Sequence, residues 1–209
     1  NPIRAVYRGF VGTGVTCLVL FYVLARWIMR EPGLFYAHVL GMFGALATVL
    51  VVQYYTGAHG KPVYETARHA QSGPALGILT GFSYGIESTV WAKYILGFII
   101  LLSWIMGGAG LEGIYYIAAA TMGIKEMKGI IMAGDAFGPI VDNAAGISEM
   151  AGLSQETRQA GDALDAVGNV TKAMAKGYAM SCATMGSFKI LMAYLFETAR
   201  PHGIQVTGL

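Results

Sequence analysis

Long apolar runs separated by short polar breaks fill the first half of the sequence. Residues 10–29 are almost continuously apolar and end in the polar break of residues 30–33. At about 1.5 Å per residue, such a run is long enough for a bilayer core of ~30 Å. Residues 34–55 form a second run of this kind, and residues 89–106 form another, which a glycine-rich break ends. The pattern predicts several membrane-spanning helices.

The segment between these runs is more polar, but it carries a glycine at every fourth position. Gly73, Gly77, Gly81 and Gly85 fall on one face of a predicted helix, where the backbone of another helix can approach closely. Polar and small residues together indicate a helix buried among other helices. We therefore expect residues 63–84 to form one helix of the bundle, followed by a connection that holds Glu87 in water.

The second half of the chain predicts two helices of about 40 residues, each about 60 Å long and roughly twice the hydrocarbon thickness. The predicted fold class is all-α: a polytopic transmembrane helix bundle of about six helices, in which the last two are long and project from the membrane. We assign the whole of residues 1–209 to one transmembrane region. The predicted helices cover residues 5–29, 34–56, 63–84, 89–106, 111–152 and 160–199.

Composition agrees with a membrane protein. Apolar residues make up 55% of the chain and charged residues 12%, whereas a soluble chain carries about twice that share of charge. The net charge of +2 gives no indication of nucleic-acid binding. The four histidines are scattered without ligand spacing, so we expect core or interface positions for them rather than a metal site.

Ionisable residues in the last two predicted helices form two stripes. Asp135, Asp142 and Glu149 are spaced by seven and lie on one helical face. The next helix carries polar residues at alternating spacings of three and four. These are Asp162, Asp165, Asn169, Lys172 and Lys176. A heptad seam is normally apolar, so this pattern inverts the usual one.

Two interpretations of the stripes remain open from spacing alone. If the helices protrude from the membrane, the stripes are faces in contact with water, and we favour this for Asp162 and the polar hairpin of residues 153–161. If the faces meet inside a membrane bundle, they mark an ion or substrate path. Facing carboxylates then need cations between them, and Mg²⁺ is bound in proteins by carboxylates together with substrate phosphates.

Long motifs connect these stripes with a known family. DAFGPIVDNAAGISEMAG at residues 135–152 closely resembles the DAYGPISDNAGGIAEMAG signature of membrane pyrophosphatases. DALDAVGNVTKAMAKGYA at residues 162–179 resembles their DALDAxGNTTKAxxKGYA stretch. Two further segments are similar to motifs of the family: QYYT at residues 53–56, and residues 72–89, which begin with SGPA and end with GIEST. The resemblance runs from about residue 34 to about residue 183.

The resemblance implies a fold and an activity. Members of this family are homodimers with sixteen transmembrane helices per subunit, which hydrolyse pyrophosphate with Mg²⁺ on the cytoplasmic side and pump H⁺ or Na⁺ outward. This chain would correspond to the seventh to twelfth helices of a protein in the membrane, for a bacterial source the inner membrane. The family's other phosphate- and Mg²⁺-binding motifs are absent from the sequence. We therefore expect an internal piece that does not hydrolyse pyrophosphate alone.

The resemblance also assigns roles to residues. Asp142 corresponds to an aspartate that binds the Mg²⁺–pyrophosphate complex, and Asn169 to an asparagine that ligates metal there. Lys172 corresponds to the position at which lysine accompanies K⁺ independence, so we predict a K⁺-independent enzyme that pumps H⁺ rather than Na⁺. Additional or supporting site residues are Asp135, Glu149, Asp165 and Lys176.

Several features depart from the family pattern, among them Ala145 in place of a glycine and Gly161 in place of a threonine. Val170 replaces a threonine, Ala175 stands where K⁺-independent members usually carry threonine, and KEMK at residues 125–128 places charges where the family is largely apolar. The alternative from another functional class is a secondary ion transporter in which intramembrane carboxylates form an ion pathway without hydrolysis. A third alternative is a degenerate gene product that only inserts into the membrane.

Overall fold

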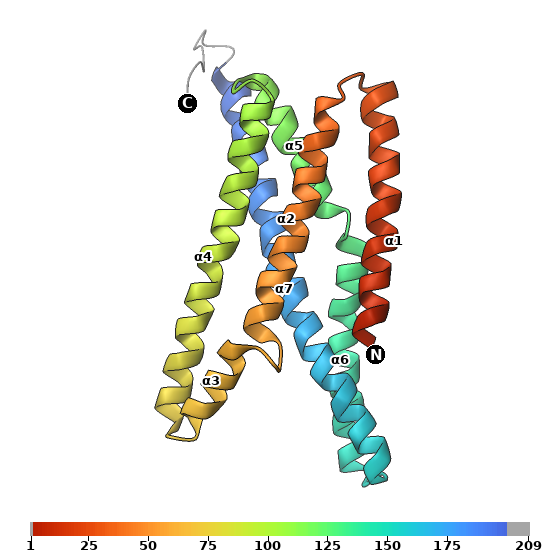
Figure 1. Ribbon diagram of the computed structural model, residues 1–209, viewed down its shortest axis with the longest axis vertical. Helices are drawn as coiled ribbons and strands as arrows, with labels where there is room; N and C mark the ends of the chain where they lie inside the picture. Colours follow the sequence, from red (N-terminus) through yellow and green to blue (C-terminus); the bar gives the residue numbers. More distant parts are fainter. Residues whose placement is uncertain (1, 200–209) are drawn as a thin grey trace. The chain divides into compact units, whose positions relative to one another are not determined.

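The computed structural model describes the backbone of residues 2–199 and the side chains of residues 8–198. Figure 1 shows a chain built of helices, and residues 2–199 contain no strand, which confirms the predicted all-α class. The elements are α1 (Pro2–Val23), the π-helical turn η1 (Leu24–Ile28), α2 (Gly33–Thr56), α3 (Lys61–Ala70), α4 (Pro74–Met106), α5 (Leu111–Lys125), α6 (Lys128–Met150) and α7 (Gln155–Ala199).

Four of these helical segments are long and apolar enough to cross a membrane. They are Arg8–Ile28, Gly33–Ala70, Pro74–Met106 and Gln155–Thr198. Many large apolar side chains on them are exposed, among them Phe82, Tyr94 and Phe98 of α4. A water-soluble protein rarely exposes large contiguous apolar surfaces, so these surfaces are suited to lipid or to further helices.

The predicted boundary between residues 84 and 89 is wrong, because α4 runs through it without interruption. The chain breaks earlier, at Gln71–Gly73, where Gly73 has φ of 145° and Pro74 opens the next helix. Glycine tolerates this backbone conformation, and proline is favoured at the first helical position because it has no N–H to leave unpaired. As a result Glu87 lies inside α4 rather than in a hydrated connection.

The predicted helix of residues 111–152 is interrupted at Glu126 and Met127, between α5 and α6. Gly123 and Gly129 flank the break, and glycine lowers helix propensity by about 1 kcal/mol relative to alanine. The charged KEMK segment therefore lies at a helix junction and not within one long helix.

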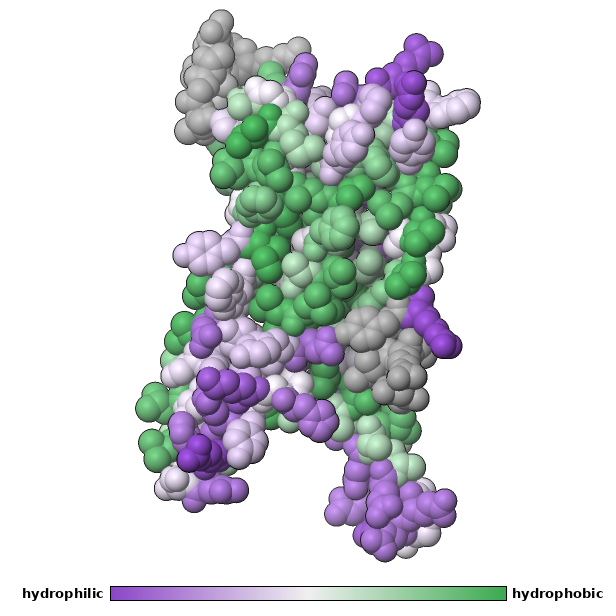
Figure 2. Space-filling view, in the orientation of Figure 1, coloured by the Kyte–Doolittle hydropathy of each residue, from purple (hydrophilic) through white to green (hydrophobic). Residues whose placement is uncertain are grey.

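Helix α7 begins five residues before the predicted residue 160 because Ser154 caps it. The Ser154 hydroxyl accepts a hydrogen bond from the backbone N–H of Thr157 at 3.3 Å, and Glu156 lies in the first turn. Both features stabilise a helix N-terminus. With 45 residues α7 is about 68 Å long, which exceeds the bilayer core. The turn between α6 and α7 carries hydrophilic side chains (Figure 2).

The contacts divide the chain into two compact units, each assembled from several segments. One unit contains Thr48–Ala92 and Lys128–Tyr178 together with the start of α1. The other contains Val11–Ala47 and Lys93–Met127 together with α7 from Ala179 onward. The core of the second unit is a cluster of small and large apolar residues from α1, α2 and α5, namely Phe21, Ala25, Leu34, Ala37 and Ala119.

Candidate functional site

Two glycines allow α6 and the first half of α7 to cross in close contact. A Cβ atom added to Gly168 would lie 2.5 Å from Cγ2 of Val141 and 3.0 Å from Cα of Gly138. A Cβ atom added to Gly138 would lie 2.8 Å from the backbone oxygen of Gly168. No side chain fits at either position without movement of the neighbouring helix. The two polar stripes are thereby held side by side, as Figure 1 shows for α6 and α7.

The lysine of the α7 stripe crosses this contact to reach the aspartate of the α6 stripe. Nζ of Lys172 lies 3.2 Å from Oδ2 of Asp142, and the Lys172 side chain is 23% exposed. Its alkyl stem passes over Gly138, since an added Cβ there would lie 2.8 Å from Cδ of Lys172. Gly138 is therefore part of the site, and the sequence analysis missed it. The sequence did indicate it, because Gly138 lies four residues before Asp142 and therefore on the same face of the helix.

One turn along α7, Asp165 and Asn169 form a second polar pair. Nδ2 of Asn169 donates a hydrogen bond to Oδ2 of Asp165 at 3.0 Å. This bond leaves the amide oxygen of Asn169 available as a ligand. Oδ1 of Asp165 is buried and has no hydrogen-bond partner among the described residues. A buried oxygen without a partner is costly, which indicates that a further group belongs beside it.

The structure does not bring the remaining predicted site residues into these pairs. Asp135 is half-buried on α6 and Glu149 is exposed near the end of that helix. Neither forms a hydrogen bond or ion pair with another side chain in the part of the chain that the structure describes. Lys176 is exposed one turn after Lys172. The predicted supporting roles of these three residues remain predictions.

Pro139 alters the backbone of α6 next to the site. It lies inside the helix and has no N–H, so the carbonyl oxygen of Asp135 loses its usual hydrogen bond from the residue four positions later. Such a residue kinks or loosens a helix, and here it lies directly after Gly138. The contact between α6 and α7 is thus placed at a point where α6 departs from regular helical hydrogen bonding.

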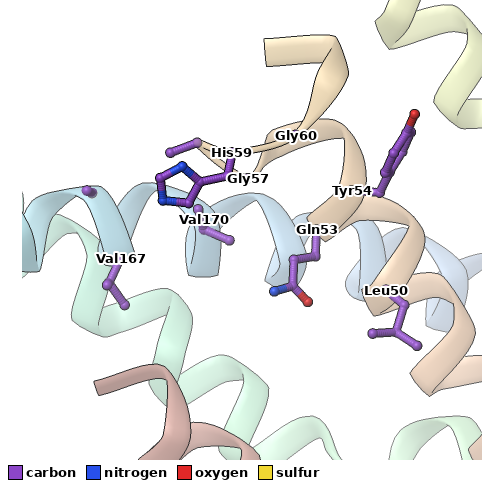
Figure 3. A pocket seen from close by; sticks show the side chains of 10 residues that line it. Leu50, Gln53, Tyr54, Gly57, His59, Gly60, Val167 and Val170 are labelled. Atoms are coloured by element: carbon purple, nitrogen blue, oxygen red, sulfur yellow. The ribbon is translucent and has the colours of Figure 1, made fainter. Parts of the chain in front are cut away.

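A pocket of about 520 Å³ lies on the neighbouring side of α7 (Figure 3). Val167 and Val170 line it from α7, and Gln53, Tyr54 and His59 line it from α2 and the connection to α3. Val170, one of the departures from the family pattern, therefore contacts this pocket. No carboxylate lines it, so the pocket is not suited to a divalent cation.

Two carboxylates near the α3–α4 hairpin are paired with tyrosines, which the sequence analysis did not anticipate. Tyr55 donates a hydrogen bond to Oε1 of Glu87 at 2.7 Å, and Tyr84 donates one to Glu65. Lys61 lies 3.6 Å from the other Glu65 oxygen. Glu87, which was expected in a hydrated connection, is an exposed residue of α4 that accepts this hydrogen bond from Tyr55.

The donor set around Asp142 fits Mg²⁺ in chemistry but does not complete a site. Asp142, Asp165 and Asn169 supply carboxylate and amide oxygens, and the unpartnered Oδ1 of Asp165 is the atom that most needs a ligand or cation. Mg²⁺ commonly uses one or two protein carboxylates together with substrate phosphates. Across the described residues, however, no group of three or more histidine, cysteine, aspartate or glutamate side chains is arranged to hold a metal ion.

Comparison with protein families gives the decisive observation. The sequence model of the family described as inorganic H⁺ pyrophosphatase matches residues 1–207. The chain belongs to this family. The suspected resemblance is thereby confirmed, and with four long apolar helices the family identifies an integral membrane protein.

Relatives within the family are named as pumps for different ions. A K⁺-insensitive pyrophosphate-energized proton pump 2 of Moorella thermoacetica is 38% identical over 94% of this chain and 30% of its own length. A K⁺-insensitive proton pump of Methanosarcina mazei is 37% identical over 91% of this chain and 29% of its own length. A putative K⁺-stimulated pyrophosphate-energized sodium pump of Clostridium tetani is 32% identical over 95% of this chain and 30% of its own length. The chain spans about three tenths of the length of these relatives.

Proposed function

We propose that this chain is part of a primary ion pump that couples Mg²⁺-dependent hydrolysis of pyrophosphate to translocation of H⁺ across the membrane. The observation that carries the proposal is the ion pair between Lys172 and Asp142, in a chain that belongs to the H⁺ pyrophosphatase family from residue 1 to residue 207. The pair places a fixed cation beside the carboxylate that the family resemblance assigns to the Mg²⁺–pyrophosphate complex.

The residues of the site have separate tasks in this proposal. Asp142 and Asn169 would hold Mg²⁺ through oxygen atoms, and Asp165 orients Asn169 through their hydrogen bond. A Mg²⁺ ion held there would supply positive charge to the phosphates during hydrolysis. Lys172 keeps a positive charge at Asp142 without a free cation. Among the described residues the carboxylates complete no metal site. By family resemblance, we expect the piece alone to be inactive and the longer protein to supply the remaining ligands.

Lys172 also supports the proposal that the activity does not require K⁺. An ammonium group tethered 3.2 Å from Asp142 occupies the place where a small monovalent cation would otherwise balance that carboxylate. We therefore propose K⁺-independent activity, as in the two proton-pump relatives. Na⁺ pumping is the second candidate, because the relative from Clostridium tetani is a putative sodium pump. By family resemblance the pump is a homodimer, in the inner membrane if the source is bacterial, with its active site on the cytoplasmic side.

The test is pyrophosphate hydrolysis by membranes that contain the longer protein, with Mg²⁺ and without K⁺. Asp142→Ala removes the proposed ligand, and Glu156→Gln changes an exposed carboxylate in the first turn of α7 as a matched control. We expect hydrolysis by the wild type and by the control, and its loss in Asp142→Ala. A folded wild-type protein that releases no phosphate, with or without K⁺, overturns the proposal and favours an ion transporter.

A further inference from the structure

Two arginines and a tryptophan line a surface cavity at the end of α1. Arg26, Trp27 and Arg30 border a volume of about 430 Å³ where the turn η1 leads into the connection to α2. All three side chains are exposed, and Trp27 is 75% exposed. Figure 2 shows hydrophilic side chains at this end of α1 next to an apolar surface. The cavity lies within the second unit and has no part in the proposed hydrolysis.

The two guanidinium groups have no partner among the described residues. Arg26 and Arg30 form no ion pair and no side-chain hydrogen bond there. Glu31, the carboxylate next to Arg30 in sequence, instead accepts a hydrogen bond from the hydroxyl of Tyr116 on α5 at 3.1 Å. The arginines therefore bring two uncompensated positive charges to one cavity. Such a cavity suits an anion with several oxygen atoms, because the planar guanidinium group can donate two parallel hydrogen bonds to a phosphate.

The backbone of Arg30 adopts a conformation that favours glycine. Its φ is 56°, in the left-handed region. The helical segment ends here, since the backbone N–H of Glu31 donates a hydrogen bond to the carbonyl oxygen of Ala25 at 3.0 Å. Glycine is the usual residue at such a helix end, because a side chain disfavours the left-handed conformation. Helix termination alone is thus better served by glycine, and strained residues of this kind cluster at binding sites. The guanidinium group of Arg30 is the feature that glycine would not provide.

The cavity lies where a membrane-crossing segment ends. The segment Arg8–Ile28 is long and apolar enough to cross a membrane, so Arg26 lies in its last turn and Arg30 lies two residues beyond it. Trp27 and Ile28 expose apolar surface beside the two arginines. Tryptophan is typical of the membrane interface, and arginine stems extend along apolar surface to place their charge among the headgroups. A phospholipid offers both a phosphate and an apolar part, whereas free phosphate offers only the oxygens.

We propose that Arg26, Trp27 and Arg30 form a binding site for the headgroup of an anionic phospholipid. The two guanidinium groups bind the phosphate, and Trp27 and Ile28 pack against the apolar part of the lipid. A lipid with net negative charge binds more tightly than a zwitterionic one, because the second kind carries its own cation toward the arginines. The site does not involve Asp142 or Lys172 and binds lipid without pyrophosphate.

The test is native mass spectrometry of the longer protein in neutral detergent, titrated with phosphatidylglycerol or with phosphatidylcholine of the same acyl chains. The variant Arg26→Gln/Arg30→Gln removes both guanidinium groups. Arg68→Gln/Arg158→Gln is the matched control, because it removes the same charge from two exposed arginines elsewhere. At about fivefold per arginine, the affinity for phosphatidylglycerol should fall about thirtyfold in the first variant. The control should keep the wild-type affinity, and phosphatidylcholine should bind equally to all three proteins.

Arg30→Gly separates loss of the site from loss of the fold. Glycine adopts the left-handed conformation without strain, so this variant should unfold no more easily than the wild type. It should nevertheless bind phosphatidylglycerol about fivefold more weakly. Equal losses in the cavity variant and in the control, or a wild type without preference for phosphatidylglycerol, would overturn the lipid site. Displacement of the lipid by inorganic phosphate would do the same, since it would identify a site for free anions. Lipid binding is measured without hydrolysis, so this outcome is independent of the proposed pump.

Discussion

Substitution of Gly138 by alanine tests the crossing that places Lys172 beside Asp142. The new Cβ atom would lie 2.8 Å from both the backbone oxygen of Gly168 and Cδ of Lys172, well inside ordinary van der Waals contact. The lysine stem can rotate away, but the backbone of α7 can relieve the first contact only if the two helices separate. The substitution therefore disturbs the ion pair and the helix contact together.

Typical energies for added methyl groups and for glycine in helices bound the loss of unfolding free energy in Gly138→Ala. Inserting a methyl group into a tightly packed contact costs about 1–3 kcal/mol. Replacing glycine by alanine inside a helix returns about 0.5–1 kcal/mol. Gly146 on the same helix provides a matched control, because an added Cβ there meets no atom within 4 Å. Gly146→Ala gains helix stability without a steric clash. The unfolding free energy of Gly138→Ala should therefore be lower than that of Gly146→Ala by about 1–3 kcal/mol.

The assay is thermal or denaturant unfolding of the longer protein in detergent, together with pyrophosphate hydrolysis by the same samples. We expect Gly138→Ala to unfold more easily than Gly146→Ala and to lose hydrolysis, while Gly146→Ala keeps the wild-type rate. Equal stability and equal hydrolysis of the two variants would refute the close crossing and the placement of Lys172 that depends on it.

Three further changes test other parts of the account. Lys172→Ala removes the tethered ammonium, so hydrolysis should become dependent on added K⁺; a K⁺-independent variant would contradict the assigned role. Gly168→Ala should destabilise the protein, because its Cβ would lie 2.5 Å from Val141, and Gly146→Ala again serves as the unfolding control. Ser154→Ala removes the cap of α7 and should cost about 1 kcal/mol without loss of hydrolysis at saturating pyrophosphate; unchanged stability would show that the cap contributes nothing.

Apolar periodicity was sufficient to predict the helical class and the span of α2, because a run of more than 20 apolar residues has few alternatives to a helix in a membrane. It failed at helix junctions. The glycines at residues 73–85 suggested one continuous packing face, but the backbone conformation of Gly73 and the start at Pro74 divide that segment. In residues 111–152, glycines flank the break at Glu126 but also lie inside both helices, so their spacing alone did not locate the break.

The stripes on α6 and α7 predicted which residues share a face, but not which of them meet. Heptad spacing treats Asp135, Asp142 and Glu149 alike, whereas the structure joins only Asp142 to Lys172. At the level of Asp142, Gly138 leaves space for the stem of Lys172. Nε2 of His38 lies 2.8 Å from Oε1 of Glu126, a contact between residues far apart in sequence that periodicity within one helix could not reveal.

The measurement that tests the central claim most directly is pyrophosphate-driven H⁺ uptake into sealed vesicles that contain the longer protein, with Mg²⁺ and without K⁺ or Na⁺. The account predicts acidification of the vesicle interior that begins on addition of pyrophosphate, is abolished by a protonophore and is lost in Asp142→Ala. Hydrolysis without any acidification in K⁺- and Na⁺-free medium would contradict the claim that this chain is part of a pyrophosphate-driven proton pump.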